Sequence, residues 1–198
     1  MSIASCAWIQ PPVASGEVLF QDDFSLTSSG WDRYRDETYE ADYADGAYRM
    51  QVFTNQTIVW SMPGVNLQDV RIVVEAQALM GSSNNLFGTI CRYKNAGNFD
   101  FFLVSSDGFI GIGHYLDGKR ELLTDESLLP TDAIPNAKSR LTLSSICNGD
   151  RLQLDINGQT VATAQTESIE SGDIGLLVGT YDEGGVTVQF DNLSLIKP

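Results

Sequence analysis

Apolar and polar residues alternate along most of the chain, and this pattern predicts β-strands rather than helices. The stretch 186–195, near the end of the chain, is a clear example of this alternation. There Val186, Val188 and Phe190 face one side, and the polar residues between them face the other. We expect this stretch to be a half-buried strand that forms the last element of the fold.

The apolar phase of this last strand shifts by one residue, because Leu193 and Leu195 are the next inward positions. A shift of this kind inside one strand indicates a β-bulge near Asp191 and Asn192. We expect the strand to lie beside an early one, and the candidate is the stretch 17–24.

Similar patterns recur along the rest of the chain, and stretch 99–104 is apolar on both faces, as expected for a central strand. The other alternating stretches are 48–52, 58–62, 70–78, 110–112, 152–156 and 174–178. The dipeptides that separate pairs of them are Asp45-Gly46, Asp107-Gly108, Asp117-Gly118 and Asn157-Gly158. Such dipeptides favour tight hairpins between antiparallel strands. Only 125–129 reads as a short helix or turn. The pattern predicts an all-β, two-sheet antiparallel jelly-roll sandwich.

Length and charge narrow the possibilities further. The 198 residues, 42% of them hydrophobic, suffice for one sandwich domain, which we place at 18–198. The formal net charge of -14 argues against nucleic acid as a partner and against electrostatic attachment to anionic membranes. It does not distinguish cation binding, glycan binding and simple solubility. No stretch is long and apolar enough to span a bilayer.

The first 17 residues read as a tether. Ile3-Ala-Ser-Cys6 has the form of a bacterial lipobox, and Pro11-Pro12 with small residues follows it. We therefore expect an extracytoplasmic, secreted or surface-tethered protein with a lipid anchor on Cys6. The alternative is an unmodified cysteine in a disordered tail.

Cys91 and Cys147 each lie in a strand-like run, 86–93 and 140–147. No Cys-x-x-Cys pattern or Cys/His cluster accompanies them, so zinc is not indicated. Two cysteines in an exported sandwich commonly pair, and such a bridge would stabilise the fold by about 4 kcal/mol in the chain-entropy model. A cytoplasmic protein would instead require two buried thiols.

Several short motifs resemble the concanavalin A-like lectin/glucanase superfamily, and especially its bacterial extracytoplasmic modules. These motifs are Asp22-Asp23-Phe24, Gly30-Trp31, Gly172–Thr180 and Phe190-Asp191-Asn192. The resemblance covers 18–198. It implies the jelly-roll fold but no single function, because lectins, hydrolases, lyases and adhesion modules share that fold.

The glucanases of this superfamily carry a Glu-x-Asp-x-x-Glu motif on a central strand, where two carboxylates cleave the glycosidic bond. The stretch that would align there, 87–93, contains no acidic residue, and the preceding strand offers only Glu75. The single histidine, His114, has no evident Ser or Cys partner and is in phase with the apolar residues of its strand. The sequence therefore does not favour an enzyme of that mechanism, and we assign no catalytic residue.

The same resemblance implies a structural Ca²⁺ site. Its ligands would be the carbonyl oxygens of Asp23 and Gly46 and the side chain of Asp191, and oxygen ligands of this kind suit calcium. The bulge predicted near Asp191 gives a second reason for a carboxylate to be aimed outward there. The alternative is that Asp191 only accepts hydrogen bonds from nearby backbone.

Glycan binding is the function that the resemblance favours, because sugars stack on aromatic rings and bond to planar polar groups of a concave sheet. The candidate residues are Trp60, Arg92, Tyr93, Asn98, Tyr115 and Tyr181. For each aromatic ring the alternative is an ordinary place in the core. We expect a monomeric, non-catalytic module that binds a glycan or cell-surface polysaccharide. A hydrolase or lyase of another mechanism and a laminin G-like adhesion module are the alternatives.

Overall fold

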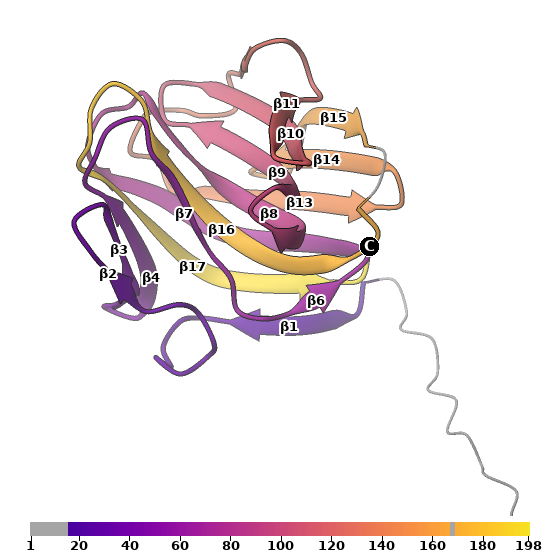
Figure 1. Cartoon of the computed structure of the whole chain (residues 1–198), viewed down its shortest axis with the longest axis horizontal. Coiled ribbons are helices and arrows are strands. Elements are labelled where there is room, and N and C mark those ends of the chain that lie inside the picture. Colours follow the sequence, from indigo (N-terminus) through magenta and orange to yellow (C-terminus); the bar gives the residue numbers. More distant parts are fainter. Residues whose placement is uncertain (1–15, 167–168) are drawn as a thin grey trace, which may run out of the picture.

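The structure, a computed structural model, describes residues 16–166 and 169–198. Cys6 and nearly all of the predicted tether lie outside these residues. The described chain contains strands and turns but no α-helix, and the strands form two antiparallel sheets (Figure 1). The predicted all-β, two-sheet class is therefore confirmed.

The first sheet, called here the nine-strand sheet, has the order β15-β14-β13-β7-β17-β4-β3-β2, with β1 also pairing with β17. Its strands are β1 Val18–Asp22, β2 Tyr34–Arg35, β3 Tyr39–Ala44, β4 Ala47–Val52, β7 Val70–Met80, β13 Leu141–Asn148, β14 Arg151–Ile156, β15 Gln159–Gln165 and β17 Val186–Ile196.

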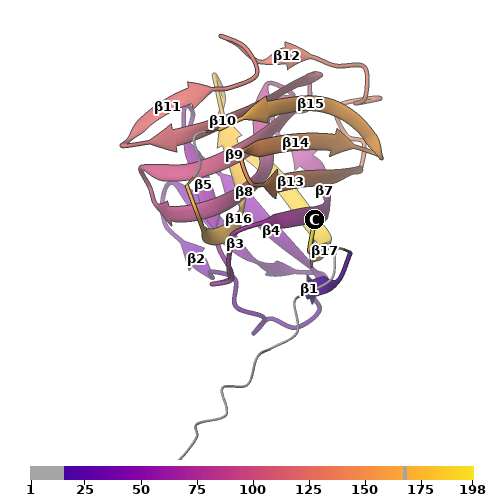
Figure 2. The same ribbon diagram turned by 90° about the vertical axis from the view of Figure 1, so that its right-hand side faces the viewer.

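The second sheet, the eight-strand sheet, has the order β11-β10-β9-β8-β16-β5, with β12 pairing with β10 and β6 with β16. Its strands are β5 Ile58–Ser61, β6 Asn66–Leu67, β8 Asn85–Asn95, β9 Asn98–Ser105, β10 Phe109–Leu116, β11 Lys119–Leu122, β12 Leu129–Pro130 and β16 Gly172–Thr180. At one edge of the sandwich β10 lies against β14 and β15 of the other sheet (Figure 2).

The four predicted dipeptides all form turns between antiparallel strands. In three of them both residues have positive φ, as at Asp117 (φ 50°) and Gly118 (φ 78°). These values are the ones that two-residue hairpins require. The stretch 125–129 forms no helix: it consists of bends that lead into β12.

The first and last strands pair, as the terminal pattern predicted: Asp22 of β1 lies opposite Leu193 of β17 (Figure 1). The predicted bulge is also present. The register of β17 against β7 shifts between Asp191 and Ser194, and Asn192 has φ 52°. Because β4 pairs with β17 only as far as Phe190, the bulge lies between the places where β4 and β1 pair with the same strand.

The main core fills the space between the two sheets. Both sheets send alternate residues inward, and Tyr48, Ile72, Phe87, Phe102 and Phe190 are among those fully buried there. Burial of alternating apolar side chains is the main stabilising contribution in a sandwich of this kind.

Two contacts join the sheets between β8 and β13. Cys91 and Cys147 form a disulfide with 6.8 Å between their Cα atoms, which confirms the predicted pair. Two residues away, the Thr89 hydroxyl donates a hydrogen bond of 2.6 Å to the Ser145 hydroxyl. The disulfide therefore links the two sheets covalently, beside the hydrogen bond and the packing between them.

The motif residues at the start of the chain organise the first loop. The buried Asp22 carboxylate accepts hydrogen bonds from the Phe24 backbone N–H at 2.8 Å and the Trp31 indole N–H at 2.9 Å. The two rings pack together with Tyr48, at centroid distances of 5.4–5.7 Å. All three rings are buried, and these residues therefore stabilise the fold.

Candidate functional site

The outer face of the eight-strand sheet carries a cluster of aromatic rings. On β9 the side chains of Phe99, Phe101 and Leu103 face outward, while Phe102 and Val104 face the main core. The neighbouring strands bring further rings to the same outer face. We call this group the aromatic face: Trp60, Tyr93, Phe99, Phe101 and Tyr115.

Phe99 lies at the centre of the aromatic face. Its ring centroid is 5.4 Å from that of Trp60, 5.5 Å from that of Tyr93 and 4.7 Å from that of Tyr115, with which it stacks. Phe99 and Phe101 are buried, whereas the three other rings are only partly buried. The two phenylalanines therefore form a floor, and Trp60, Tyr93 and Tyr115 present ring surface to the solvent.

A shallow cleft crosses this face and encloses only about 10 Å³. Its lining residues are Ile58, Trp60, Phe99, Phe101, Leu103, Tyr115, Arg120 and Leu177. A surface of this shape suits stacking of a flat ligand face on the rings better than enclosure of a whole small molecule.

Arg92 does not belong to the aromatic face, and this corrects the interpretation from sequence. Its φ of 56° interrupts the alternation of β8, and both registers of that strand shift nearby. The bulge turns the Arg92 side chain inward and leaves Tyr93 on the outer face. Arg92 is 1% exposed. A ligand on the outer face cannot contact it.

The guanidinium group of Arg92 is occupied by the protein itself. Nε donates to the Gln68 carbonyl at 2.9 Å, and Nη2 donates to the Gly149 carbonyl at 2.8 Å. Ion pairs with Asp69 and Asp100 complete its surroundings. Arg92 therefore ties together the chain segments at this end of the sandwich.

The remaining predicted residues lie around the aromatic face. Asn98 starts β9 and connects two turns: its amide donates to Asn95 Oδ1 at 3.1 Å, and its Oδ1 accepts from the Asp117 N–H at 3.2 Å. Tyr181 follows β16 and packs against the edge of the outer apolar cluster. The structure thus brings Trp60, Tyr93 and Tyr115 together, with Asn98 and Tyr181 at the periphery.

The sequence analysis missed Phe99, Phe101 and Arg120. The two phenylalanines lie in a strand that is apolar on both faces, so the pattern alone does not show which face is outside. Arg120 could have been found, because a two-residue turn at Asp117-Gly118 fixes Tyr115 opposite Arg120.

Asp100 and His114, which lie opposite each other on β9 and β10, point away from the aromatic face. Asp100 lies on β9 but is buried on the core side, where it accepts from the Thr166 hydroxyl at 3.3 Å and pairs with Arg92. Burial raises the pKa of Asp100, and the Arg92 guanidinium only partly offsets this. His114 is also buried, with Nδ1 3.4 Å from the Thr166 hydroxyl and Nε2 3.7 Å from Glu121. No carboxylate lines the cleft among the described residues.

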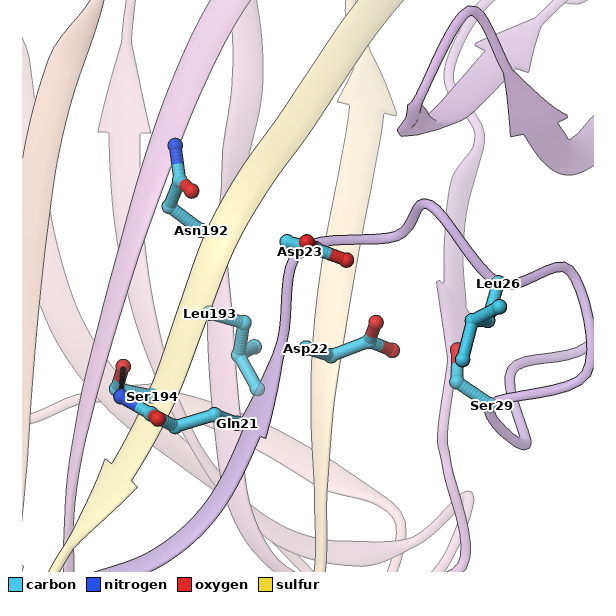
Figure 3. A pocket seen from close by; sticks show the side chains of 8 residues that line it. All are labelled: Gln21, Asp22, Asp23, Leu26, Ser29, Asn192, Leu193 and Ser194. Atoms are coloured by element: carbon cyan, nitrogen blue, oxygen red, sulfur yellow. Dashed lines mark hydrogen bonds between the residues drawn. The ribbon is translucent and has the colours of Figure 1, made fainter.

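A second, polar hollow of about 610 Å³ lies beside the bulge of β17. Its lining residues are Gln21, Asp22, Asp23, Leu26, Ser29, Asn192, Leu193 and Ser194. Figure 3 shows the Asp22 carboxylate turned toward the loop that carries Leu26 and Ser29, with Asn192 across the hollow. The Asp23 carboxylate accepts hydrogen bonds from the Ser25 N–H at 3.0 Å and hydroxyl at 2.7 Å, which hold its pKa below the usual range.

This hollow adjoins the predicted calcium ligands. The registers of β1 and β4 against β17, extended by one or two residues, bring Asp23 and Gly46 toward the bulge that carries Asp191. Asp191 Oδ1 accepts from the Asn192 N–H at 2.8 Å. In the described residues no group of three or more His, Cys, Asp or Glu side chains is arranged to hold a metal. The expected set relies on two backbone carbonyls, so calcium remains a prediction.

Comparison with known proteins shows the fold. No family model and no curated protein matches the chain. Solved structures do match: a carbohydrate-binding module from Bacillus subtilis has a TM-score of 0.66 at 13% identity, covering 85% of this chain and 96% of the other. A Bacillus subtilis protein of unknown function with a galectin-like fold has a TM-score of 0.68 at 10% identity, covering 93% and 97%.

A β-1,3-1,4-glucanase (lichenase) from a mouse hindgut metagenome also matches, with a TM-score of 0.67 at 10% identity, covering 90% of this chain and 99% of the other. Identities this low establish the fold only. The chain has the concanavalin A-like jelly-roll fold, which is the fold that the resemblance of its motifs implied. No helix in the described ranges has the length and hydropathy needed to cross a membrane.

Proposed function

We propose that the protein binds carbohydrate on the aromatic face and does not cleave it. The observation that carries the proposal is the arrangement of partly exposed rings, Trp60, Tyr93 and Tyr115, over the buried floor of Phe99 and Phe101. The C–H face of a sugar ring is apolar and stacks on such rings, while the rim supplies polar groups.

Binding without cleavage is supported by the chemistry of the cleft. A glycosidase needs two carboxyl groups about 5–10 Å apart on either side of the scissile bond. None of the described residues that line the cleft is acidic. Asp100, on the central strand, is buried behind the face and paired with Arg92.

The structural neighbours are consistent with this proposal but divided in activity, since one is named a carbohydrate-binding module and another a lichenase. A hydrolase or lyase of another mechanism is therefore the second candidate function. An adhesion module without glycan binding is the third, and the polar hollow near β17 is the surface it would use.

We also propose that the protein acts outside the cytoplasm. The Cys91–Cys147 disulfide supports this location, because such bonds persist in oxidising compartments. Attachment to a surface through a lipid on Cys6 is a separate proposal. Mass spectrometry of the native N-terminal peptide tests it, and an unmodified Cys6 would contradict it.

The test is a glycan array followed by a reducing-end assay on each glycan that binds. We expect binding without new reducing ends, and Trp60→Ala and Tyr115→Ala should each weaken it tenfold or more, equal to about 1.4 kcal/mol. Tyr34→Ala is the matched control, because Tyr34 is an exposed ring on the other sheet (45% exposed). New reducing ends would support the enzyme, and no binding at all would support the adhesion module.

A further inference from the structure

One positively charged side chain, that of Arg120, lines the cleft on the aromatic face. Arg120, on β11, is directly opposite Tyr115 of β10, so the two side chains lie on the same face of the sheet. Its guanidinium carbon is 5.9 Å from the centre of the Phe101 ring, a cation–π contact. Arg120 is exposed and is the only charged residue among those lining the cleft in the described chain.

The guanidinium of Arg120 differs from those of three other arginines on the surface. Arg33, Arg35 and Arg140 each pair with a carboxylate, at 2.7, 2.8 and 3.1 Å. Within residues 16–166 and 169–198, by contrast, no ion pair or hydrogen bond engages the Arg120 side chain beyond its contact with Phe101. Stacking on a ring uses the flat face of the guanidinium and leaves the N–H groups along its edge free to donate.

The acidic residues of β11 and β9, Glu121 and Asp100, do not pair with Arg120. Glu121, its neighbour on β11, is opposite His114 and so lies on the other side of the strand. Asp100 is buried and paired with Arg92. The net charge of -14 opposes an anionic ligand at long range. Salt screens this repulsion beyond about 8 Å at physiological ionic strength. The local contact with Arg120 therefore determines whether an anionic ligand binds.

We propose that the aromatic face binds an acidic glycan, with the carboxylate of a uronic acid residue paired to the edge of Arg120. This inference rests on the proposed function, because the neighbouring sugar ring would stack on Trp60 and Tyr115. A planar carboxylate accepts two parallel N–H bonds from one guanidinium, which is the strongest geometry for such a pair. The cleft would thus recognise both the apolar face and the charge of its ligand.

The test compares matched ligands and matched variants. Oligogalacturonides and oligoglucuronides are measured against their carboxyl-reduced, neutral forms, alongside an array of neutral, uronic and sulfated glycans. The variants are Arg120→Gln, Trp60→Ala and Arg71→Gln, the last a control because Arg71 is exposed on β7 of the other sheet. We expect at least one uronic glycan to bind tenfold or more tighter than its neutral form. Arg120→Gln should remove this preference, and Arg71→Gln should keep it.

The outcomes separate the two proposals. One outcome is binding that depends on Trp60 and yet shows no preference for the acidic form, and another is binding that does not change with Arg120→Gln. Either result would overturn the proposal of an acidic ligand and leave the proposal of carbohydrate binding standing. Hits confined to sulfated glycans would overturn the assignment to a carboxylate. Failure of every arrayed glycan to bind would overturn both proposals.

Discussion

Arg92 and Asp100 form an ion pair inside the sandwich, with 3.4 Å between Nη1 and Oδ2, and neither side chain is more than 1% exposed. The pair joins β8 to β9 where β8 bulges. Because two buried charges lose their hydration, such a pair contributes little net stability, but removing one partner leaves a costly unpaired charge. We therefore expect the loss of either partner to disturb the bulge of β8 that precedes Tyr93.

The first prediction concerns the pH dependence of stability. Burial raises the pKa of Asp100 above its usual 3.8 despite Arg92. The folded state thus holds its proton to higher pH than the unfolded state, and the contribution of Asp100 to stability is lost as pH rises through the folded pKa. The variant Asp100→Asn has no ionisable group at this position. Urea unfolding from pH 3 upward should show the wild type losing stability relative to this variant as pH rises.

The opposite trend would contradict this account. If the wild type gained stability relative to Asp100→Asn with rising pH, the pKa of Asp100 would be lowered in the folded protein. The lowering of this pKa by Arg92 would then exceed the raising by burial.

The second prediction concerns the disulfide. The Cys91–Cys147 bond spans 56 residues of sequence, and closing a loop of that length stabilises by about 4 kcal/mol in the chain-entropy model. Reduction, or the double variant Cys91→Ala/Cys147→Ala, should lower the free energy of unfolding by about that amount. Urea unfolding with and without reductant measures it. A loss below about 1 kcal/mol would show that packing and the Thr89–Ser145 hydrogen bond hold β8 on β13 without the disulfide.

The third prediction concerns calcium. If Asp23, Gly46 and Asp191 bind Ca²⁺, a concentration of 100 times Kd should stabilise the fold by about 2.7 kcal/mol. Thermal unfolding should show this shift with Ca²⁺ and a smaller one with Mg²⁺, which demands stricter geometry. Asp191→Asn should abolish it, while Asp132→Asn, an exposed acid in a distant loop, should not. An equal shift in both variants would remove Asp191 from the site.

Much of the fold was predictable from sequence because it depends on local rules. The alternation in 186–195 predicted the last strand and its bulge, and the Asp-Gly and Asn-Gly pairs predicted four turns. The disulfide was also predicted, since Cys91 and Cys147 lie in strand-like runs and two cysteines commonly pair in a sandwich that is expected to be exported. The strand, its bulge and the turns need no knowledge of which sheet a strand joins.

The site was only partly predictable, because it depends on which way single side chains face. Positive φ is rare for arginine, and nothing in the run 87–93 signals that Arg92 adopts it. The expected alternation therefore did not indicate that the Arg92 side chain turns inward beside Tyr93. Phe99 and Phe101 were hidden for another reason: their strand is buried on both faces.

The central claim is that a glycan binds on the aromatic face, and chemical-shift mapping tests it most directly. Isotope-labelled protein is titrated with a glycan that binds on the array, and the signals that move are assigned. We predict changes at the Trp60 indole and the rings of Tyr93 and Tyr115, with the buried Trp31 indole unmoved as the internal control. Changes gathered instead at the residues of the polar hollow beside β17, with Trp60 unmoved, would contradict the account.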